Sequence, residues 1–282
     1  TVLIGLCFIF LYSSKNNIQG MLISHGSHVI HDDPIAKVEW EHHAKNLIEG
    51  AFPRTAIQTC ITQKFTNKYK NKSTIYCNTG PLLFRKNNHL VTKENLKRNI
   101  FNLSSKVLLI THVGTPKPFE TFRPWVYETI DEYIYNINLI SEYLEDKKDI
   151  FLGIRFRENM WLSAEEFSSR VRISSNSFIV DKNVSLFDNL KSSDFIISYS
   201  STAIEEALEL EVPVATFDPQ KKYNHLNSAH ENLNPHIYAH LTKINELDSV
   251  LSNFLRPNRA FDSFKEGFEV DYDIDQIVSG IL

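Results

Sequence analysis

Between residues 106 and 217, short apolar runs alternate with segments whose apolar side chains recur at helical spacing. Runs such as 106–111 (KVLLIT) are almost wholly apolar, which is typical of strands in a parallel sheet covered on both faces. Residues 125–146 place their apolar side chains on one helical face. The pattern predicts strands at 106–111, 150–156, 177–181, 194–198 and 212–217, and helices at 125–146, 163–172, 185–191, 201–210 and 243–255. This alternation predicts a doubly wound α/β domain built on one parallel sheet.

The first part of the chain shows a similar alternation, less regularly. The pattern predicts strands at 2–12, 21–24, 55–60 and 73–77, and helices at 35–49 and 61–69. Residues 85–105 are polar and rich in Lys and Asn, which is typical of a linker, with one short helix around 92–100. Because the chain opens at Thr1 inside an apolar run, we expect an incomplete N-terminal domain over 1–84 and a complete C-terminal domain over 106–282.

The composition narrows the class of protein. Of the 282 residues, 42% are hydrophobic and 23% are charged, as in ordinary globular domains. A net charge of −4 provides no basic surface for wrapping nucleic acid, so we expect no nucleic-acid partner. Cys7, Cys60 and Cys77 form no CxxC pair, which argues against a disulfide scaffold and a cysteine zinc site. The chain also lacks a GxGxxG fingerprint, a GxxxxGK(S/T) phosphate loop and a GxSxG elbow.

Three consecutive hydroxyl residues, Ser200, Ser201 and Thr202, follow the predicted strand 194–198 and open the predicted helix 201–210. Ser and Thr are favoured N-caps, and one of the three would serve that purpose. Hydroxyls beside unpaired first-turn amides also suit a phosphate group. Ligands of doubly wound sheets lie beyond the carboxyl ends of the strands. The residues leave capping and phosphate binding as alternatives.

Two further groups of side chains could carry chemistry. Arg155 and Arg157 alternate at the end of a predicted strand, which would place both on one face, where arginine suits phosphate binding. Ion pairs with Glu158 or Glu165 are the alternative. His25, His28 and His31 recur every three residues and precede Asp32 and Asp33, and such side chains can bind metals. Because no HExxH motif is present, we expect no metal site.

The segment 192–219 (SSDFIISYSSTAIEEALELEVPVATFDP) resembles the C-terminal signature of GT-B glycosyltransferases, especially bacterial enzymes of capsule, lipopolysaccharide and other surface-carbohydrate synthesis. The matching residues are Asp194, Ile196, Ile197, Ser198, Ser200, Ser201, Thr202, Glu206, Ala207, Leu208, Pro213 and Val214. Upstream, SHGS (24–27) resembles the His-Gly loop of the N-terminal domain, and TIYCNTGPLLF (74–84) resembles the segment that crosses between domains. KVLLITHVGTP (106–116) resembles the first C-domain strand with its glycine loop. The family often has a basic residue followed by His-Pro or Arg-Pro where this chain has Arg157-Glu158.

The resemblance implies an α/β fold of the GT-B kind, with two Rossmann-like domains facing a cleft. The residues that it implies for the donor nucleotide and its phosphates are Ser200, Ser201, Thr202, Glu206, Arg155, Gly114 and Thr115. On the acceptor side it implies a general base that faces the cleft. His25 is the first choice, because a pKa near 6.5 suits proton transfer, and Asp32 is the alternative. Glu206 could instead be a first-turn acid that complements the helix dipole.

The implied activity is transfer of a sugar from a nucleotide-activated donor to a surface-glycan or lipid-linked acceptor, without a metal or other cofactor. A polyol-phosphate transferase of the CDP-glycerol type is one alternative, and a non-catalytic module that binds sugar nucleotides or polysaccharide is another. The implied location is the cytoplasm or, through peripheral association, the inner face of the cytoplasmic membrane.

Overall fold

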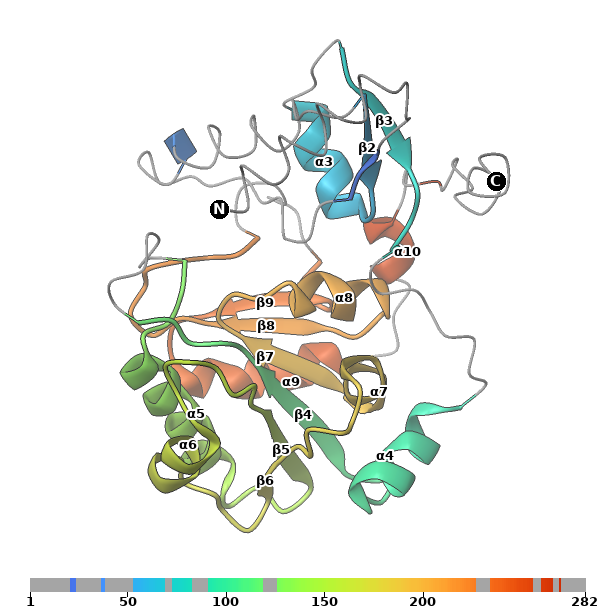
Figure 1. Ribbon diagram of the computed structural model, residues 1–282. Coiled ribbons are helices and arrows are strands. Elements are labelled where there is room, and N and C mark those ends of the chain that lie inside the picture. The colour runs from blue at the N-terminus through green and yellow to red at the C-terminus, as the bar shows by residue number, and fades with distance from the viewer. Residues whose placement is uncertain are drawn as a thin grey trace. The chain divides into compact units, whose positions relative to one another are not determined.

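The computed structural model describes residues 21–23, 37–38, 53–68, 73–82, 91–118, 126–226, 234–255, 260–265 and 269 (Figure 1). The chain divides into two compact units. The first comprises Thr1–Lys86, Leu226–Glu231 and Lys265–Leu282, and the second comprises Asn87–His225 and Asn232–Phe264. The division falls at residues 86 and 87, so most of the segment expected to be a linker counts with the second unit.

The described part of the first unit contains a small parallel sheet and helix α3. Its strands, in the order β1-β2-β3, are β1 (Met21–Leu22), β2 (Arg54–Ile57) and β3 (Ile75–Asn78). Helix α3 (Cys60–Lys68) begins after Thr59, whose Oγ1 accepts a hydrogen bond from the Thr62 amide at 3.1 Å. These elements confirm three predicted strands and the predicted helix 61–69. The predicted strand 2–12 and helix 35–49 lie outside the described residues, apart from residues 37 and 38, which are helical.

The second unit is a doubly wound α/β fold whose parallel sheet has the order β6-β5-β4-β7-β8-β9 among the described residues. The strands are β4 (Leu108–Val113), β5 (Ile150–Arg155), β6 (Ser177–Ile179), β7 (Phe195–Ser198), β8 (Val214–Phe217) and β9 (Tyr238–Leu241). Every predicted strand between 106 and 217 is present, and all pair in parallel, which confirms the predicted sheet. Strand β9, which pairs with β8, was not predicted.

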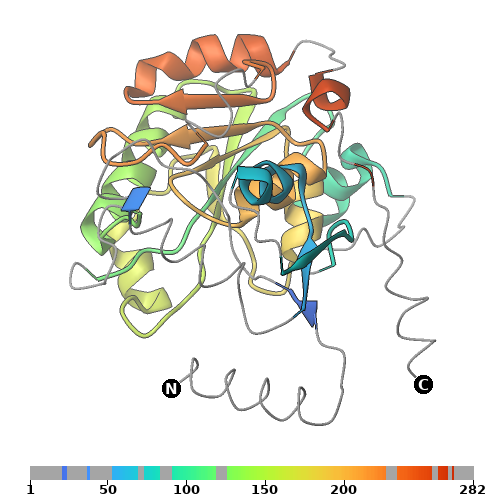
Figure 2. The same cartoon turned by 90° about the horizontal axis from the view of Figure 1, so that it is seen from above.

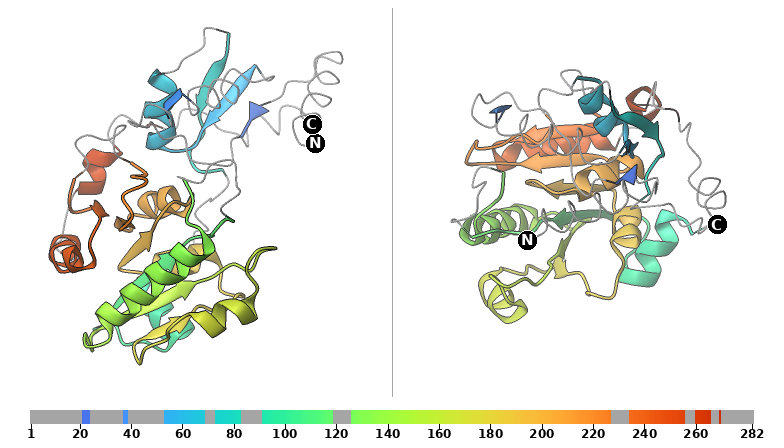
Figure 3. Two further views of the ribbon diagram at one scale, coloured as in Figure 1. Left: turned by 90° about the vertical axis from the view of Figure 1, so that its left-hand side faces the viewer. Right: turned by 45° about the horizontal axis from the view of Figure 1, so that its top comes forward.

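The helices of this unit are α4 (Lys93–Phe101), α5 (Ile130–Leu144), α6 (Ala164–Arg170), α7 (Leu186–Ser192), α8 (Ala203–Glu209), η1 (Ile244–Glu246), α9 (Leu247–Phe254) and α10 (Ala260–Phe264). One face of the sheet packs against α5, α6 and α9 in a continuous apolar core. Figure 2 shows α9 beside the edge strand β9, and Figure 3 shows α5 and α6 along the same side of the sheet. Helices α7 and α8 contact strands on the opposite face, where Asn189 of α7 donates to Thr111 Oγ1 at 3.1 Å.

Helix α5 shows how the sequence sets its own boundary. Thr129 is the N-cap, and its side chain accepts a hydrogen bond from the Glu132 amide while Glu132 accepts from the Thr129 amide. This reciprocal capping box satisfies amides that the helix cannot pair internally. Behind it, Tyr133, Ile137 and Ile140 are fully buried on one helical face, which fixes α5 against the sheet. The predicted helix therefore begins later than residue 125, at the capping box.

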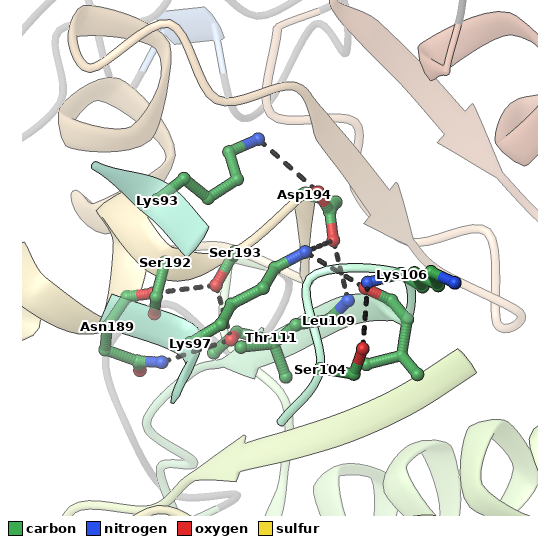
Figure 4. A network of polar contacts seen from close by, with 11 residues as sticks. Lys93, Lys97, Ser104, Lys106, Leu109, Thr111, Asn189, Ser192, Ser193 and Asp194 are labelled. Atoms are coloured by element: carbon green, nitrogen blue, oxygen red, sulfur yellow. Dashed lines mark hydrogen bonds and ion pairs between the residues drawn. The ribbon is translucent and has the colours of Figure 1, made fainter. Parts of the chain in front are cut away.

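A polar network at the amino-terminal edge of the sheet fixes α4 to the strands (Figure 4). The Asp194 carboxylate, just before β7, accepts a hydrogen bond from the Leu109 amide of β4 at 2.7 Å. Lys97 Nζ lies 2.5 Å from Asp194 Oδ2, with the lysine side chain only 4% exposed, and Lys93 Nζ lies 3.4 Å from Oδ1. Asp194 therefore has a structural role at the edge opposite to the one where ligands of such sheets bind.

No helix among the described residues is both long and apolar enough to cross a membrane.

Candidate functional site

The reversal of strand order in the second unit marks the candidate site. The chain moves from β4 outward through β5 and β6, then returns to the other side of β4 with β7. Helices that follow the two central strands then cover opposite faces, and a crevice forms at the carboxyl ends of those strands. Gly114 and Thr115 follow β4 directly, and Ser200, Ser201 and Thr202 follow β7. The topology thus places both predicted donor loops on the same edge, at the switch point.

The hydroxyl turn, which we define as Ser200–Thr202, uses only part of its hydrogen-bonding capacity. Ser201 Oγ accepts a hydrogen bond from the Ala203 amide at 3.2 Å, and Ser201 O accepts from the Ile204 amide at 3.0 Å. Thr202 is the N-cap residue of α8, but its side chain makes no capping hydrogen bond. Within the described part of the chain, Ser200 makes no side-chain hydrogen bond either, and all three residues are half-buried. Capping accounts for one hydroxyl of the three.

Arg155 and Glu206 influence each other electrostatically at this edge. Arg155 ends β5, and its Nη1 donates to Val184 O at 2.9 Å, which holds the guanidinium half-buried. Burial raises the pKa of Glu206 to about 7, and the charge of Arg155 opposes that rise. Burial also lowers the pKa of Arg155, while Glu206 raises it. The two side chains, predicted separately for the donor, therefore interact electrostatically.

The alternative ion pairs for the arginines are not formed in the described part of the chain. Glu158 Oε1 instead accepts a hydrogen bond from the Ala164 amide at 3.2 Å, and the charge partner of Arg155 is Glu206. Arg157 lies beyond the end of β5 and is exposed, so the expectation that Arg155 and Arg157 share one strand face is wrong. The strand ends before the alternation can reach Arg157.

The buried carboxyl group of Glu128 lies beside the loop after β4, and the sequence analysis did not identify it. Glu128 is 4% exposed, and its Oε1 accepts a hydrogen bond from Asn136 Nδ2 at 2.7 Å. Burial raises the pKa of Glu128 to about 8, with a smaller rise from Glu132. A Cβ on Gly114 would lie 3.7 Å from Glu128 Oε2 and 3.1 Å from Tyr133 Cε2. The loop therefore needs glycine here because α5 approaches it so closely.

Other titratable side chains lie at the same edge and were also missed. Burial raises the pKa of Asp218, whose Oδ2 accepts a hydrogen bond from the Tyr223 amide at 2.6 Å. Burial lowers the pKa of His240, which is bonded through Nδ1 to Thr216 Oγ1 at 2.9 Å. His112, on the opposite face of the sheet from Thr216, has its pKa lowered to about 4 by burial and is neutral at physiological pH. Their one sequence signal was their position at strand ends.

The predicted acceptor-side residues His25 and Asp32, together with His28 and His31, lie outside the described residues. Within the ranges that the structure describes, no three His, Cys, Asp or Glu side chains are grouped so that they could hold a metal ion.

No protein-family model matches the chain, and no curated protein is significantly similar to it in sequence. Solved structures do match, at 12–15% identity. MnaA of S. aureus, solved with UDP, gives a TM-score of 0.56 at 15% identity, over 96% of this chain and 69% of MnaA. The wall teichoic acid polymerase TagF, soaked with CDPG, gives 0.54 at 14% identity, over 95% and 67%.

A mutant of TarM of S. aureus, in complex with fondaparinux, alpha-GlcNAc-glycerol and UDP, gives a TM-score of 0.50 at 12% identity. The match covers 93% of this chain but half of TarM. At this level of identity the similarities concern the fold. Together with the two parallel sheets, they confirm the predicted architecture: the chain has a GT-B-like α/β fold with two Rossmann-like units.

Proposed function

We propose that the chain is a glycosyltransferase that moves a sugar from a nucleotide-activated donor to a surface-glycan or lipid-linked acceptor. The observation that carries the proposal is the meeting of three features at one edge of the second unit. The Gly114 loop and the hydroxyl turn Ser200–Thr202 flank the switch point, and the half-buried Arg155 ends the neighbouring strand. Hydroxyls, a close-approaching glycine loop and a desolvated cation suit a phosphate ester.

In this proposal the phosphates of the donor lie against Ser200 and Thr202, and the backbone of Gly114 and Thr115 allows close approach. Arg155 offsets the negative charge that develops on the leaving nucleotide, an effect that is stronger in a site shielded from water. Because this charge comes from the protein, a metal ion is not required. In this proposal Glu206 accepts a hydrogen bond from a ribose or sugar hydroxyl. His25, or alternatively Asp32, takes the proton from the acceptor hydroxyl.

We place the protein in the cytoplasm, with peripheral association at the inner face of the membrane where a lipid-linked acceptor would be found. The partners are then a nucleotide-sugar and a glycan or lipid-linked acceptor.

A second candidate is a polyol-phosphate transferase of the CDP-glycerol type. The specific observation in its favour is the structural match to TagF, a wall teichoic acid polymerase whose structure was determined after a soak with CDPG. The same hydroxyl turn and arginine would then bind the phosphates of a CDP-linked donor. A screen that includes both kinds of donor separates the two candidates.

The first experiment is a thermal-shift screen of the full chain against UDP-, GDP-, CDP- and CMP-sugars and CDP-glycerol. A ligand at 100 times its Kd adds about 2.7 kcal/mol to stability, so a true donor stands out. Release of the nucleotide in the presence of an acceptor, with and without EDTA, then tests the activity and its independence of metal. If no nucleotide shifts the melting transition, the proposal is wrong.

The hydroxyl turn provides a sharper test, because the Thr202 side chain makes no capping hydrogen bond. Thr202→Ala should leave stability within about 0.5 kcal/mol of the parent. Its affinity for the best nucleotide should fall about ten- to 150-fold, since a hydrogen bond to a charged group contributes about 1.5–3 kcal/mol.

Ser163→Ala is the matched control, because Ser163 caps α6 by accepting from the Glu166 amide at 3.1 Å. It should lose about 1 kcal/mol of stability without a change in nucleotide affinity. Unchanged affinity in Thr202→Ala would contradict the proposed donor site.

A further inference from the structure

The turn between β5 and α6 is built as a rigid support for two apolar side chains. Asn159 and Leu162 form a bridge, and Asn159 Oδ1 accepts hydrogen bonds from the amides of Trp161 at 2.9 Å and Leu162 at 3.1 Å. Leu162 is fully buried in the core. The side chain of Asn159 and the burial of Leu162 therefore fix the turn at its base, and Met160 and Trp161 form its tip.

The tip exposes more apolar surface than folding explains. Met160 is 85% exposed and Trp161 is 36% exposed, although Met and Trp are commonly buried. Single exposed apolar residues are ordinary, but two large ones in sequence on a fixed turn indicate a contact surface. Met160 is therefore open to solvent over most of its surface.

Cations lie beside the tip, and the tip lies at the edge that carries the candidate donor loops. Lys117 Nζ lies 4.9 Å from the centre of the Trp161 ring. Arg157 and Glu158 are both exposed just before the turn. Lys117 also belongs to the loop that begins at Gly114, so its contact with Trp161 connects this loop to the tip. Whatever surface the tip contacts will lie close to the carboxyl edge of the sheet.

We propose that Met160 and Trp161 insert into the lipid–water interface of an anionic membrane and hold the carboxyl edge of the second unit at the lipid surface. Trp prefers the headgroup level of a bilayer, Met provides hydrocarbon, and the ammonium group of Lys117 beside the Trp161 ring favours anionic headgroups. An exposed tip suits a soft surface. Two side chains give weak, reversible binding. The proposal extends the proposed function, on which it rests for the assumption of a lipid-linked acceptor.

The test is sedimentation of the full chain with vesicles of phosphatidylglycerol and phosphatidylethanolamine. The partition coefficient of Met160→Ser/Trp161→Ser should be at least about tenfold lower than that of the parent. Ile173→Ser is the matched control, because Ile173 is 46% exposed and precedes β6, at the opposite edge of the sheet. This control should bind vesicles like the parent.

A second measurement reports on Trp161 itself. In a Trp40→Phe/Trp125→Phe background, Trp161 is the one remaining tryptophan, and its emission should shift to the blue when vesicles are added. The proposal is overturned if the parent does not sediment with vesicles, or if the double variant sediments as strongly as Ile173→Ser. Binding of a soluble glycan that is lost in the double variant, with vesicle binding unchanged, would also overturn it in favour of a glycan platform.

Nucleotide shifts measured on the same variants separate this proposal from the donor site. The tip variants should keep the parent's nucleotide affinity. Loss of vesicle binding with normal nucleotide binding supports the tip, and a chain that binds vesicles through the tip but no nucleotide contradicts only the proposed function.

Discussion

Replacement of Lys97 by Met should destabilise the second unit far more than the same replacement of Lys93, although both lysines pair with one carboxylate. The Lys97 side chain is 4% exposed and its Nζ lies 2.5 Å from Asp194 Oδ2. The Lys93 side chain is 38% exposed and lies 3.4 Å from Oδ1. Removal of the buried partner costs up to about 3–5 kcal/mol, because the remaining charge is then compensated only by the more exposed Lys93. An exposed pair contributes about 0–1 kcal/mol.

The assay is urea unfolding followed by far-UV circular dichroism, with hydrogen exchange over residues 107–113 as the local readout. Asp194 also accepts from the Leu109 amide, so exchange at the start of β4 should speed up in Lys97→Met. Adding Asp194→Asn to Lys97→Met should restore part of the lost stability, because it removes a carboxylate charge that keeps only the more exposed Lys93 as its ionic partner. Equal losses in the two lysine variants would refute the argument that burial makes this pair important.

Two further predictions concern the loop after β4 and the buried Glu128 beside it. The folded-state pKa of Glu128 is raised to about 8, so the stability of Glu128→Gln relative to the parent should depend on pH. The two proteins should be equally stable below about pH 4.5. Between about pH 4.5 and 8 the variant should become increasingly more stable than the parent, and above that range the difference should stay constant. The folded parent holds this extra proton, so it loses stability as the pH rises through that window, by a total on the order of 5 kcal/mol in pH-dependent urea unfolding. A constant difference across the range would contradict the raised pKa. Gly114→Ala should cost about 1–3 kcal/mol, because the new Cβ would lie 3.1 Å from the fully buried Tyr133 ring, and Tyr133→Phe, which keeps the same ring carbon, should not relieve that cost.

The sequence predicted those strands whose apolar runs can be recognised without knowledge of their neighbours in the fold. β4, β5, β7 and β8 are apolar runs buried on both faces, and such runs are typical of central parallel strands. β9 was missed because its sequence, YAHL, mixes apolar and polar residues. On this edge strand Tyr238 and His240 both bond to Thr216, a pairing that no local pattern can reveal.

The segment 85–105, expected to be a linker, also makes a long-range contact that its local sequence does not reveal. Helix α4 (KENLKRNIF) has few apolar residues, and its predicted short helix was placed correctly at 92–100. Its attachment to the second unit depends on the buried ion pair of Lys97 with Asp194, far along the chain. A lysine in a polar helix carries no sign that it will be buried, so composition favoured a linker.

For the candidate site, topology predicted more than residue type. A parallel sheet with reversed strand order brings the ends of β4 and β7 together, so Gly114 and the hydroxyl turn had to meet at one edge. Glu128 was not predictable in this way. In the sequence it is an acid shortly before a helix, which is normally a solvated position, and its burial depends on Asn136 of α5 facing back toward it.

The electrostatic interaction between Arg155 and Glu206 changes what each residue would do toward a phosphate. Alone, a half-buried arginine would bind any anion, and a half-buried glutamate would repel one. Together, Arg155 lowers the pKa of Glu206 against the rise that burial causes. A phosphate that takes the charge of Arg155 would weaken this opposition, so the pKa of Glu206 would rise and the carboxyl group would be more often neutral. The pair would therefore admit an anionic ligand without leaving an unopposed carboxylate beside it, and a neutral Glu206 could donate a hydrogen bond to the same ligand.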